Sequence, residues 1–152
     1  ERNSLVGSEM CIRDRDEAEV AAMRGHVGHG LDIIAASHWL ADAAPVVGGH
    51  HERIDGDGYP RGLAGPAVPL LARLFSVVDV FDALTRERPY KPPLPLDQAL
   101  ELLAQGRGRQ FDAAVVDCFL AIAPDLWREF ASLDDAAVER VADRLLSRYF
   151  HL

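Results

Sequence analysis

Residues 70–85, LLARLFSVVDVFDALT, determine the fold class that this sequence predicts. A helix built from this stretch carries apolar side chains on nearly every side, which is typical of a buried central helix. Neighbouring segments repeat apolar residues at three- and four-residue spacing, and no stretch alternates convincingly as a strand. We therefore predict an all-α fold, a helical bundle in which other helices pack around residues 70–85.

The segment that begins at Asp16 opens with acidic residues, as helix N-termini often do. It then carries an apolar stripe at helical spacing, made of Val20, Met23, Val27, Leu31 and Ile34. Its glycines weaken the middle by roughly 1 kcal/mol each relative to alanine, so we expect two short helices or one bent helix. Further helices are predicted over residues 43–51, 96–105, 111–123 and 134–150, and loops over 52–69 and 88–95.

Composition restricts the kinds of function. The 152 residues fit one domain, and the net charge of −8 argues against binding long nucleic acid. A small phosphorylated ligand remains compatible with this charge if metal ions or local arginines reverse the sign at the site. No apolar run reaches the ~20 residues of a membrane helix. Cys11 and Cys118 do not make a disulfide framework, so we expect a reducing, cytoplasmic location.

Asp79 is the most informative single residue, because it lies on the apolar helix of residues 70–85. An unpaired ionised carboxylate in such a place costs several kcal/mol at least. A metal ion would compensate its charge, and a buried salt bridge or a cap to a neighbouring helix would do so equally well. Asp82 follows at i+3 on the same helix face and is a candidate to contact a bound ligand.

Two adjacent histidines open the stretch HHERIDGDGYP, residues 50–60. On a helix His50 and His51 would diverge by ~100°, so we expect them to serve two neighbouring ions, one each, as a two-metal phosphoesterase requires. His26 supplies a third imidazole from an earlier helix. Nitrogen and oxygen ligands of this kind suit iron, manganese or zinc. The alternative is a polar loop with two imidazoles and an ordinary surface or core His26; His29 and His38 keep that ordinary interpretation.

Six pieces of sequence recur in the order of a known family: the MRGHVGHG helix, HHE, DGDGYP, DVFDALT, RPYK and GRGRQFD. Over residues 16–122 the chain resembles the signature half of the HD-GYP domain family. The resemblance implies a helical bundle around a centre of two or three divalent metal ions, iron, manganese or zinc. It also implies hydrolysis of cyclic di-GMP to pGpG or onward to GMP.

The resemblance assigns roles residue by residue. The family's metal ligands fall on His26, His50, His51 and Asp79. Its nucleotide contacts fall on Tyr59, Arg88 and Lys91, and Asp82 falls beside the metal cluster, which makes Asp79 and Asp82 the candidate catalytic acids. Without the resemblance, Arg88 and Lys91 would be interpreted as a solvated basic turn and the GYP stretch as a structural corner.

The chain departs from the family in one respect: it contains no His-Asp dipeptide, which the family carries on an earlier helix. Residues 1–15 show no helical or strand period, and SLVGSEMCIRDR resembles a translated sequencing adaptor, although an ordinary flexible terminus is the alternative. We expect residues 1–15 to be a non-native or disordered leader and residues 16–152 to be the C-terminal part of an HD-GYP domain that ends in an amphipathic helix.

Two hypotheses follow for function. In the first, the parent protein is a cyclic di-GMP phosphodiesterase, and this chain alone is inactive or nearly so and exposes an apolar surface that favours association. In the second, the chain is a degenerate HD-GYP module that binds nucleotide or a signalling partner without cutting. A phosphohydrolase of mononucleotides would leave GYP and RPYK unexplained. Expected partners are cyclic di-GMP, a receiver or sensor domain in the parent, and a second copy or a GGDEF-domain protein.

Overall fold

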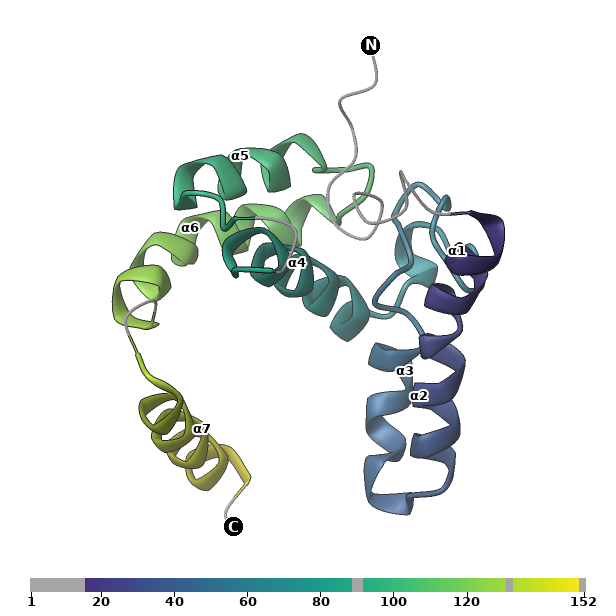
Figure 1. The fold of residues 1–152 in the computed structure, drawn as a ribbon, viewed down its shortest axis with the longest axis horizontal. Coiled ribbons are helices and arrows are strands. Elements are labelled where there is room, and N and C mark those ends of the chain that lie inside the picture. The colour runs from purple at the N-terminus through teal and green to yellow at the C-terminus, as the bar shows by residue number, and fades with distance from the viewer. Residues whose placement is uncertain (1–15, 89–91, 131–132, 151–152) are drawn as a thin grey trace. The chain divides into compact units, whose positions relative to one another are not determined.

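The computed structural model describes residues 16–88, 92–130 and 133–150. The described residues fold as helices and connecting turns without strands (Figure 1), which confirms the all-α prediction. The chain divides into two compact units, Glu1–Phe119 and Leu120–Leu152, and every candidate site residue belongs to the first. None of the helices in the described part of the chain is long and apolar enough to cross a membrane.

The segment after Asp16 forms two helices, α1 (Glu17–Arg24) and α2 (His26–Ala35), as one of the two expected arrangements predicted. A capping box starts α1: Glu19 N–H donates to the Asp16 carboxylate at 2.8 Å, and the Asp16 N–H donates to the Glu19 carboxylate at 3.2 Å. The break falls at Gly25. Consequently His26 begins a new helix.

The predicted helix over residues 43–51 is wrong in length. A 3-10 helix, η2 (His38–Ala43), leads into α3, which is limited to Ala44–Val47, and the chain then turns through Gly48 and Gly49. Two successive glycines disfavour continuation of a helix. The turn brings Gly49 so close to α4 that an added Cβ would lie 3.0 Å from the Ala72 Cβ. His50 and His51 therefore lie in a turn and not on a helix.

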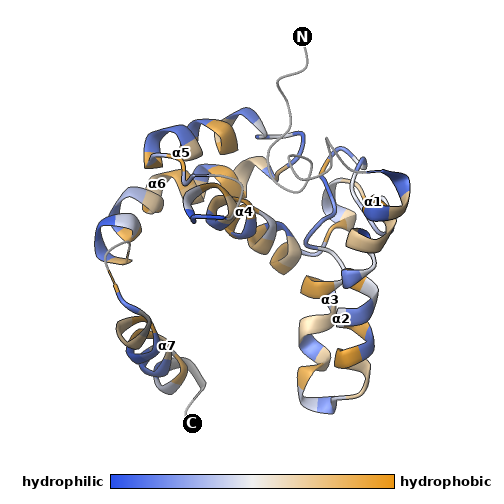
Figure 2. Cartoon of the chain, viewed as in Figure 1, coloured by the Kyte–Doolittle hydropathy of each residue, from blue (hydrophilic) through white to orange (hydrophobic). Residues whose placement is uncertain are grey.

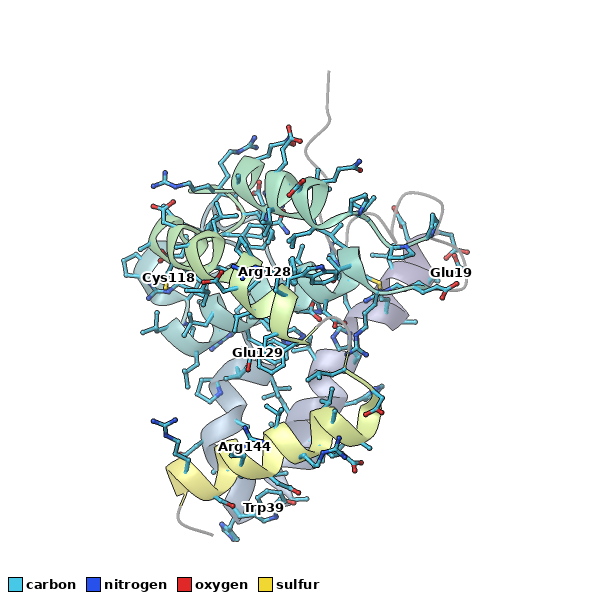
Figure 3. All side chains as sticks on the ribbon, turned by 90° about the vertical axis from the view of Figure 1, so that its left-hand side faces the viewer. Glu19, Trp39, Cys118, Arg128, Glu129 and Arg144 are labelled. Atoms are coloured by element: carbon cyan, nitrogen blue, oxygen red, sulfur yellow. The ribbon has the colours of Figure 1, made fainter. Side chains whose placement is uncertain are left out.

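Helix α2 packs against η2 and α3. The contact is close: a Cβ placed on Gly30 would lie 2.8 Å from the Val47 Cγ1 atom. Val27 and Ile34 of the predicted apolar stripe are buried. Trp39 in η2 is 83% exposed and lies at the end of this helical arrangement (Figure 3).

Helix α4 (Leu70–Thr85) has the predicted bounds, but the prediction of a buried central helix holds for only one of its faces. One face is buried, with Ala72, Ser76, Val77, Val80 and Leu84. The opposite face carries large side chains that are 42–57% exposed: Leu70, Leu71, Leu74, Phe75 and Val78. The hydropathy colours of Figure 2 show many hydrophobic residues along α4. Helices α3 and α5 pack on α4, and they cover only part of its circumference.

Helix α5 (Leu96–Gln105) agrees with prediction, and its Ala99 and Leu103 are fully buried. Helix α6 (Ala113–Phe130) is longer than the predicted 111–123, since it continues through Pro124. Phe111, just before α6, is buried as well. Together with the buried face of α4, these residues form the core that supports the candidate site.

The second unit contains α7 (Asp135–Phe150), as predicted for residues 134–150. Its start is capped by Asp134, whose carboxylate accepts a hydrogen bond from the Ala137 N–H at 2.7 Å.

Candidate metal centre

Three imidazoles meet in the first unit. His26 stands at the start of α2, and His50 and His51 stand in the turn after α3. One ligand nitrogen from each lies within 4.8 Å of the other two. The Nε2 atoms of His26 and His51 are 3.1 Å apart, and the rings of His50 and His51 are 4.0 Å apart at 41°. The predicted divergence of His50 and His51 is wrong, because a turn and not a helix holds them.

Backbone carbonyls orient two of the rings. The Nδ1 atom of His26 lies 2.5 Å from the Met23 carbonyl oxygen, and that of His50 lies 2.9 Å from the Val47 carbonyl oxygen. A carbonyl oxygen only accepts, so each Nδ1 carries the proton and each Nε2 keeps its lone pair. Metal-binding histidines use this kind of outer hydrogen bond to fix the tautomer and the ring orientation.

His51 is held in its neutral form. Burial, and after it the neighbouring His50 and His26, lower the pKa of the His51 imidazole from its usual 6.5 to about 3, because a further positive charge there is unfavourable. A metal ion binds imidazole only when the nitrogen is unprotonated. His51 therefore presents its metal-binding form at neutral pH.

The stretch after His51 folds back over it. Gly58 approaches Glu52 so closely that an added Cβ would lie 2.5 Å from the Glu52 Cα. The Tyr59 N–H donates to the His51 carbonyl at 3.2 Å, and the Tyr59 ring stacks on the His51 ring at 4.7 Å and 23°. The GYP stretch thus serves as a structural corner that also packs a tyrosine against a candidate metal ligand.

Glu52 holds this corner closed. Glu52 is 4% exposed, and its carboxylate accepts hydrogen bonds from the backbone N–H groups of Arg61 at 2.8 Å and Leu63 at 2.9 Å. Two charge-assisted bonds compensate the burial of the carboxylate. The sequence had indicated no role for Glu52 of the HHE stretch. A glutamate next to two candidate ligands was the available signal.

An open pocket lies beside the cluster. Its walls include His50, His51, Tyr59 and, from α4, Asp79. Asp79 does not join the group of ligand atoms within 4.8 Å that the three histidines form among the described residues. The structure thus places Asp79 on the same pocket without bringing it into the cluster.

Two further predicted site residues, Asp82 and Arg88, do not line this pocket. Asp82 forms a salt bridge with Arg86 at 2.7 Å, and its side chain is 49% exposed. Neither Asp82 nor the exposed Arg88 is among the described residues that line the pocket. Lys91 lies outside the described residues. Two arginines that the sequence did not single out, Arg24 and Arg53, line the pocket instead.

The donor set fits a divalent metal ion. Two imidazole nitrogens that bind the same ion at about 2.1 Å lie about 3.0 Å apart at a right angle and about 3.4 Å apart at the tetrahedral angle. The 3.1 Å between the Nε2 atoms of His26 and His51 falls within this range. Neutral imidazole suits zinc, iron, manganese and related ions. The geometry defines an all-α protein with a three-histidine site of metal-binding type beside an open pocket.

Comparison with known proteins agrees with this class. The family model described as HD domain matches residues 13–115. The chain is 44% identical over 106 residues to the cyclic di-GMP phosphodiesterase response regulator RpfG of Xanthomonas campestris, covering 68% of this chain and 28% of that protein. It is 38% identical over 128 residues to a cyclic di-GMP phosphodiesterase of Vibrio cholerae, covering 80% and 26%.

A further relative in Vibrio cholerae, 3'3'-cGAMP-specific phosphodiesterase 3, is 36% identical over 107 residues, which cover 70% of this chain and 23% of that protein. The chain belongs to the HD domain family and is an HD-GYP member. Membership of this family implies divalent metal binding. The matched stretches amount to about a quarter of the length of these relatives.

Proposed function

We propose that this chain is part of a metal-dependent phosphodiesterase that hydrolyses cyclic di-GMP to pGpG or GMP. The observation that carries the proposal is the cluster of His26, His50 and His51, whose ligand atoms lie within 4.8 Å of one another at the edge of a pocket. The names of the relatives from Xanthomonas campestris and Vibrio cholerae support this substrate class.

The residues have distinct parts in this proposal. His26, His50 and His51 hold divalent ions, two or three of iron, manganese or zinc, with Asp79 as a further ligand from the pocket wall. Such ions lower the pKa of bound water and neutralise phosphoryl oxygens. Tyr59 lines the pocket and fixes the orientation of His51 by stacking. Arg88 and Lys91 are proposed to bind the nucleotide, and Asp82 to act beside the metals.

The absence of a His-Asp dipeptide from this sequence limits what the chain does alone. A carboxylate that bridges two ions is the usual means of holding them close, and Asp79 is not in the histidine cluster. We therefore propose that the 152-residue chain binds metal and nucleotide but turns over little substrate. Metal analysis and a hydrolysis assay on the purified chain test this, and two bound ions with multiple turnovers would contradict it.

A second substrate is favoured by a specific observation. Several relatives are 3'3'-cGAMP-specific phosphodiesterases, and one of them is 48% identical to this chain over 56 residues. Both dinucleotides carry two phosphodiester groups and at least one guanine, so both suit a pocket with metal ions and arginines. Binding measurements with cyclic di-GMP and 3'3'-cGAMP in parallel separate the two, and the tighter ligand identifies the substrate class.

The degenerate binding module is the other candidate. Reading the source locus upstream of Arg15 separates it from the enzyme. A helix with a His-Asp dipeptide in the continuous gene supports the phosphodiesterase. A substituted dipeptide in that helix supports nucleotide binding without catalysis, and it would make His50 and His51 remnants of a lost centre.

A further inference from the structure

Arg24 stands beside the histidine cluster. It is the last residue of α1, two positions before His26, and it lines the same pocket as His50 and His51. Its guanidinium carbon lies over the Tyr59 ring, 4.9 Å from the ring centroid. Since Tyr59 stacks on His51, the side chain of Arg24 is placed at the edge of the candidate metal centre.

No acid among the described residues pairs with the charge of Arg24. The other arginine on the pocket wall, Arg53, donates to both carboxylate oxygens of Asp55 at 2.9 and 2.6 Å. Within the described ranges 16–88, 92–130 and 133–150, no acidic side chain forms a salt bridge with Arg24. Of the two described arginines on the pocket wall, Arg24 is therefore the one whose charge no described acid pairs, and this charge is available to an incoming anion.

The chemistry of the guanidinium suits a phosphate. It carries five N–H donors in a fixed fork, so a guanidinium over an aromatic ring still directs donors at oxygen acceptors. The cation–π contact with Tyr59 holds the side chain near the site before a ligand arrives, which lowers the entropy lost on binding. Asp57 and Asp79 also line the pocket, and their negative charges would repel a phosphate. The positive charge of Arg24 offsets this repulsion.

We propose that Arg24 is a substrate-binding residue whose guanidinium binds a phosphate group of a cyclic dinucleotide held beside His51. The inference rests on the proposed function and deepens it, because it assigns a phosphate contact to α1, an element to which neither the HHE nor the GYP stretch belongs.

The test is equilibrium binding of cyclic di-GMP to the 152-residue chain in the presence of Mn²⁺, by calorimetry. Replacement of Arg24 by alanine should weaken binding by about 10- to 100-fold, because it removes charge-assisted hydrogen bonds. R24K should give an intermediate loss, since it keeps the charge but not the fork. The loss caused by R24A should shrink at about 1 M salt, where charges are screened.

Arg107 provides the matched control. It is an exposed arginine of the same unit, pairs with Asp117 at 2.6 Å and does not line the pocket. R107A removes the same charge and should bind as the unsubstituted chain does. Thermal unfolding midpoints of R24A and R24K within about 1 °C of that chain would exclude a purely structural effect, because a lost packing interaction of 1 kcal/mol shifts the midpoint of a chain of this size by about 2–4 °C.

The outcomes separate the two proposals. If the unsubstituted chain binds cyclic di-GMP and both R24A and R24K bind equally well, the assignment of Arg24 is overturned and the proposed function stands. A loss in R24A that is unchanged at high salt also overturns it, because the residue would then act only by holding Tyr59. If the unsubstituted chain binds no cyclic dinucleotide, the proposed function is overturned, and the assignment of Arg24 with it.

Discussion

The Nε2 atoms of His26 and His51 lie 3.1 Å apart, although 25 positions separate the two residues in the sequence. The break between α1 and α2 puts one imidazole at the start of a helix, and the turn after α3 brings the other to it. The His26 Nδ1–H donates a hydrogen bond to the Met23 carbonyl oxygen, so the His26 Nε2 carries a lone pair that faces His51. Two lone pairs that face each other at this distance would repel, so either a proton on the His51 Nε2 or a metal ion must lie between the two nitrogens.

Removal of either imidazole should weaken metal binding. We expect H26A and H51A each to lose more than about 100-fold in affinity for Zn²⁺ or Mn²⁺, since even outer hydrogen-bond partners of metal ligands are typically worth 10- to 100-fold. Competition with a chelator measures the affinity. His29, an exposed histidine of α2 outside the cluster, supplies the control, and H29A should bind metal normally. Equal affinity in H26A would remove His26 from the centre.

The stability of the chain should fall as the pH falls from 6.5 toward 3, because of His51. Its folded pKa of about 3 lies below the ordinary value of 6.5. Above pH 6.5 both folded and unfolded forms are neutral; between these values the unfolded chain binds a proton that the folded chain does not. The contribution of His51 to the free energy of unfolding is therefore fully present above pH 6.5 and is lost progressively below it. Urea unfolding at pH 7.0, 6.0 and 5.0 measures the loss.

Carboxyl groups with lowered pKa values act only at the acid end of this window. The pKa values of Asp55 and Asp112 are lowered from 3.8, first of all by hydrogen bonds from Arg53 and Arg73 respectively. Their contributions disappear only below about pH 4. An H51Q variant, which does not titrate, should therefore lose less stability between pH 7 and pH 5 than the unsubstituted chain. Parallel pH profiles for the two proteins would contradict the role given to His51.

The GYP stretch should not tolerate a side chain at Gly58. A Cβ there would lie 2.4 Å from the Arg53 nitrogen and 2.5 Å from the Glu52 Cα, both backbone atoms that cannot yield cheaply. We expect G58A to cost about 2 kcal/mol or more, the range of overpacked sites, and to disturb the Tyr59 stack on His51. Chemical denaturation measures the loss of stability, and metal titration measures the damage to the centre.

Gly28 is the matched control for this prediction. It lies within α2, and an added Cβ there would meet nothing within 4 Å. G28A should therefore raise stability by up to about 1 kcal/mol, the helix-propensity difference between alanine and glycine. The two Gly→Ala substitutions are predicted to have opposite signs. A stabilised or neutral G58A would show that Gly58 is not needed for close packing of the loop on Glu52.

Much of this arrangement followed from the sequence, and the failures have physical causes. The stretch 70–85 gave its helix bounds correctly because no proline or glycine interrupts it. Its burial was predicted wrongly, since apolar composition does not reveal whether a neighbouring element covers each face. The positions of His26, His50 and His51 as a group followed from the motif. The close contact of the His50 and His51 rings was not predicted, because it depends on two glycines that end α3 before the histidines.

Contacts between residues far apart in the chain were the hardest to predict from the sequence. Glu52 accepts from Arg61 and Leu63, nine and eleven positions away, and no local pattern marks such a contact. Arg24 meets Tyr59 across an even longer separation. Both contacts become apparent only when the turn after α3 and the end of α1 are placed in space.

Glu52 should be necessary for the folded loop. In E52Q the amide nitrogen cannot accept, so one of the two backbone N–H groups loses its partner at a cost of about 1–3 kcal/mol. We expect E52A to lose more, because both N–H groups are then unsatisfied. Urea unfolding at pH 7 measures both. E101Q, at an exposed position of α5, should change stability by less than about 0.5 kcal/mol and controls for the lost charge.

The exposed face of α4 should make the chain associate. Leu70, Leu71, Leu74, Phe75 and Val78 form a contiguous helical face, each 42–57% exposed. Exposed apolar patches of this kind are typical of interaction surfaces and promote self-association. Sedimentation velocity over a range of concentrations should detect species larger than a monomer. The double variant L71E/L74E places two charges on this face and should shift the chain toward monomer at the same concentrations.

A separate variant tests whether the effect belongs to this face. Ile33 of α2 is 65% exposed and lies outside α4, so I33E adds a charge at an exposed apolar position elsewhere. I33E should associate as the unsubstituted chain does. If I33E becomes monomeric while L71E/L74E does not, association proceeds through the α2 region. If all three proteins remain monomeric at every concentration, the α4 face does not bind a second copy of this chain.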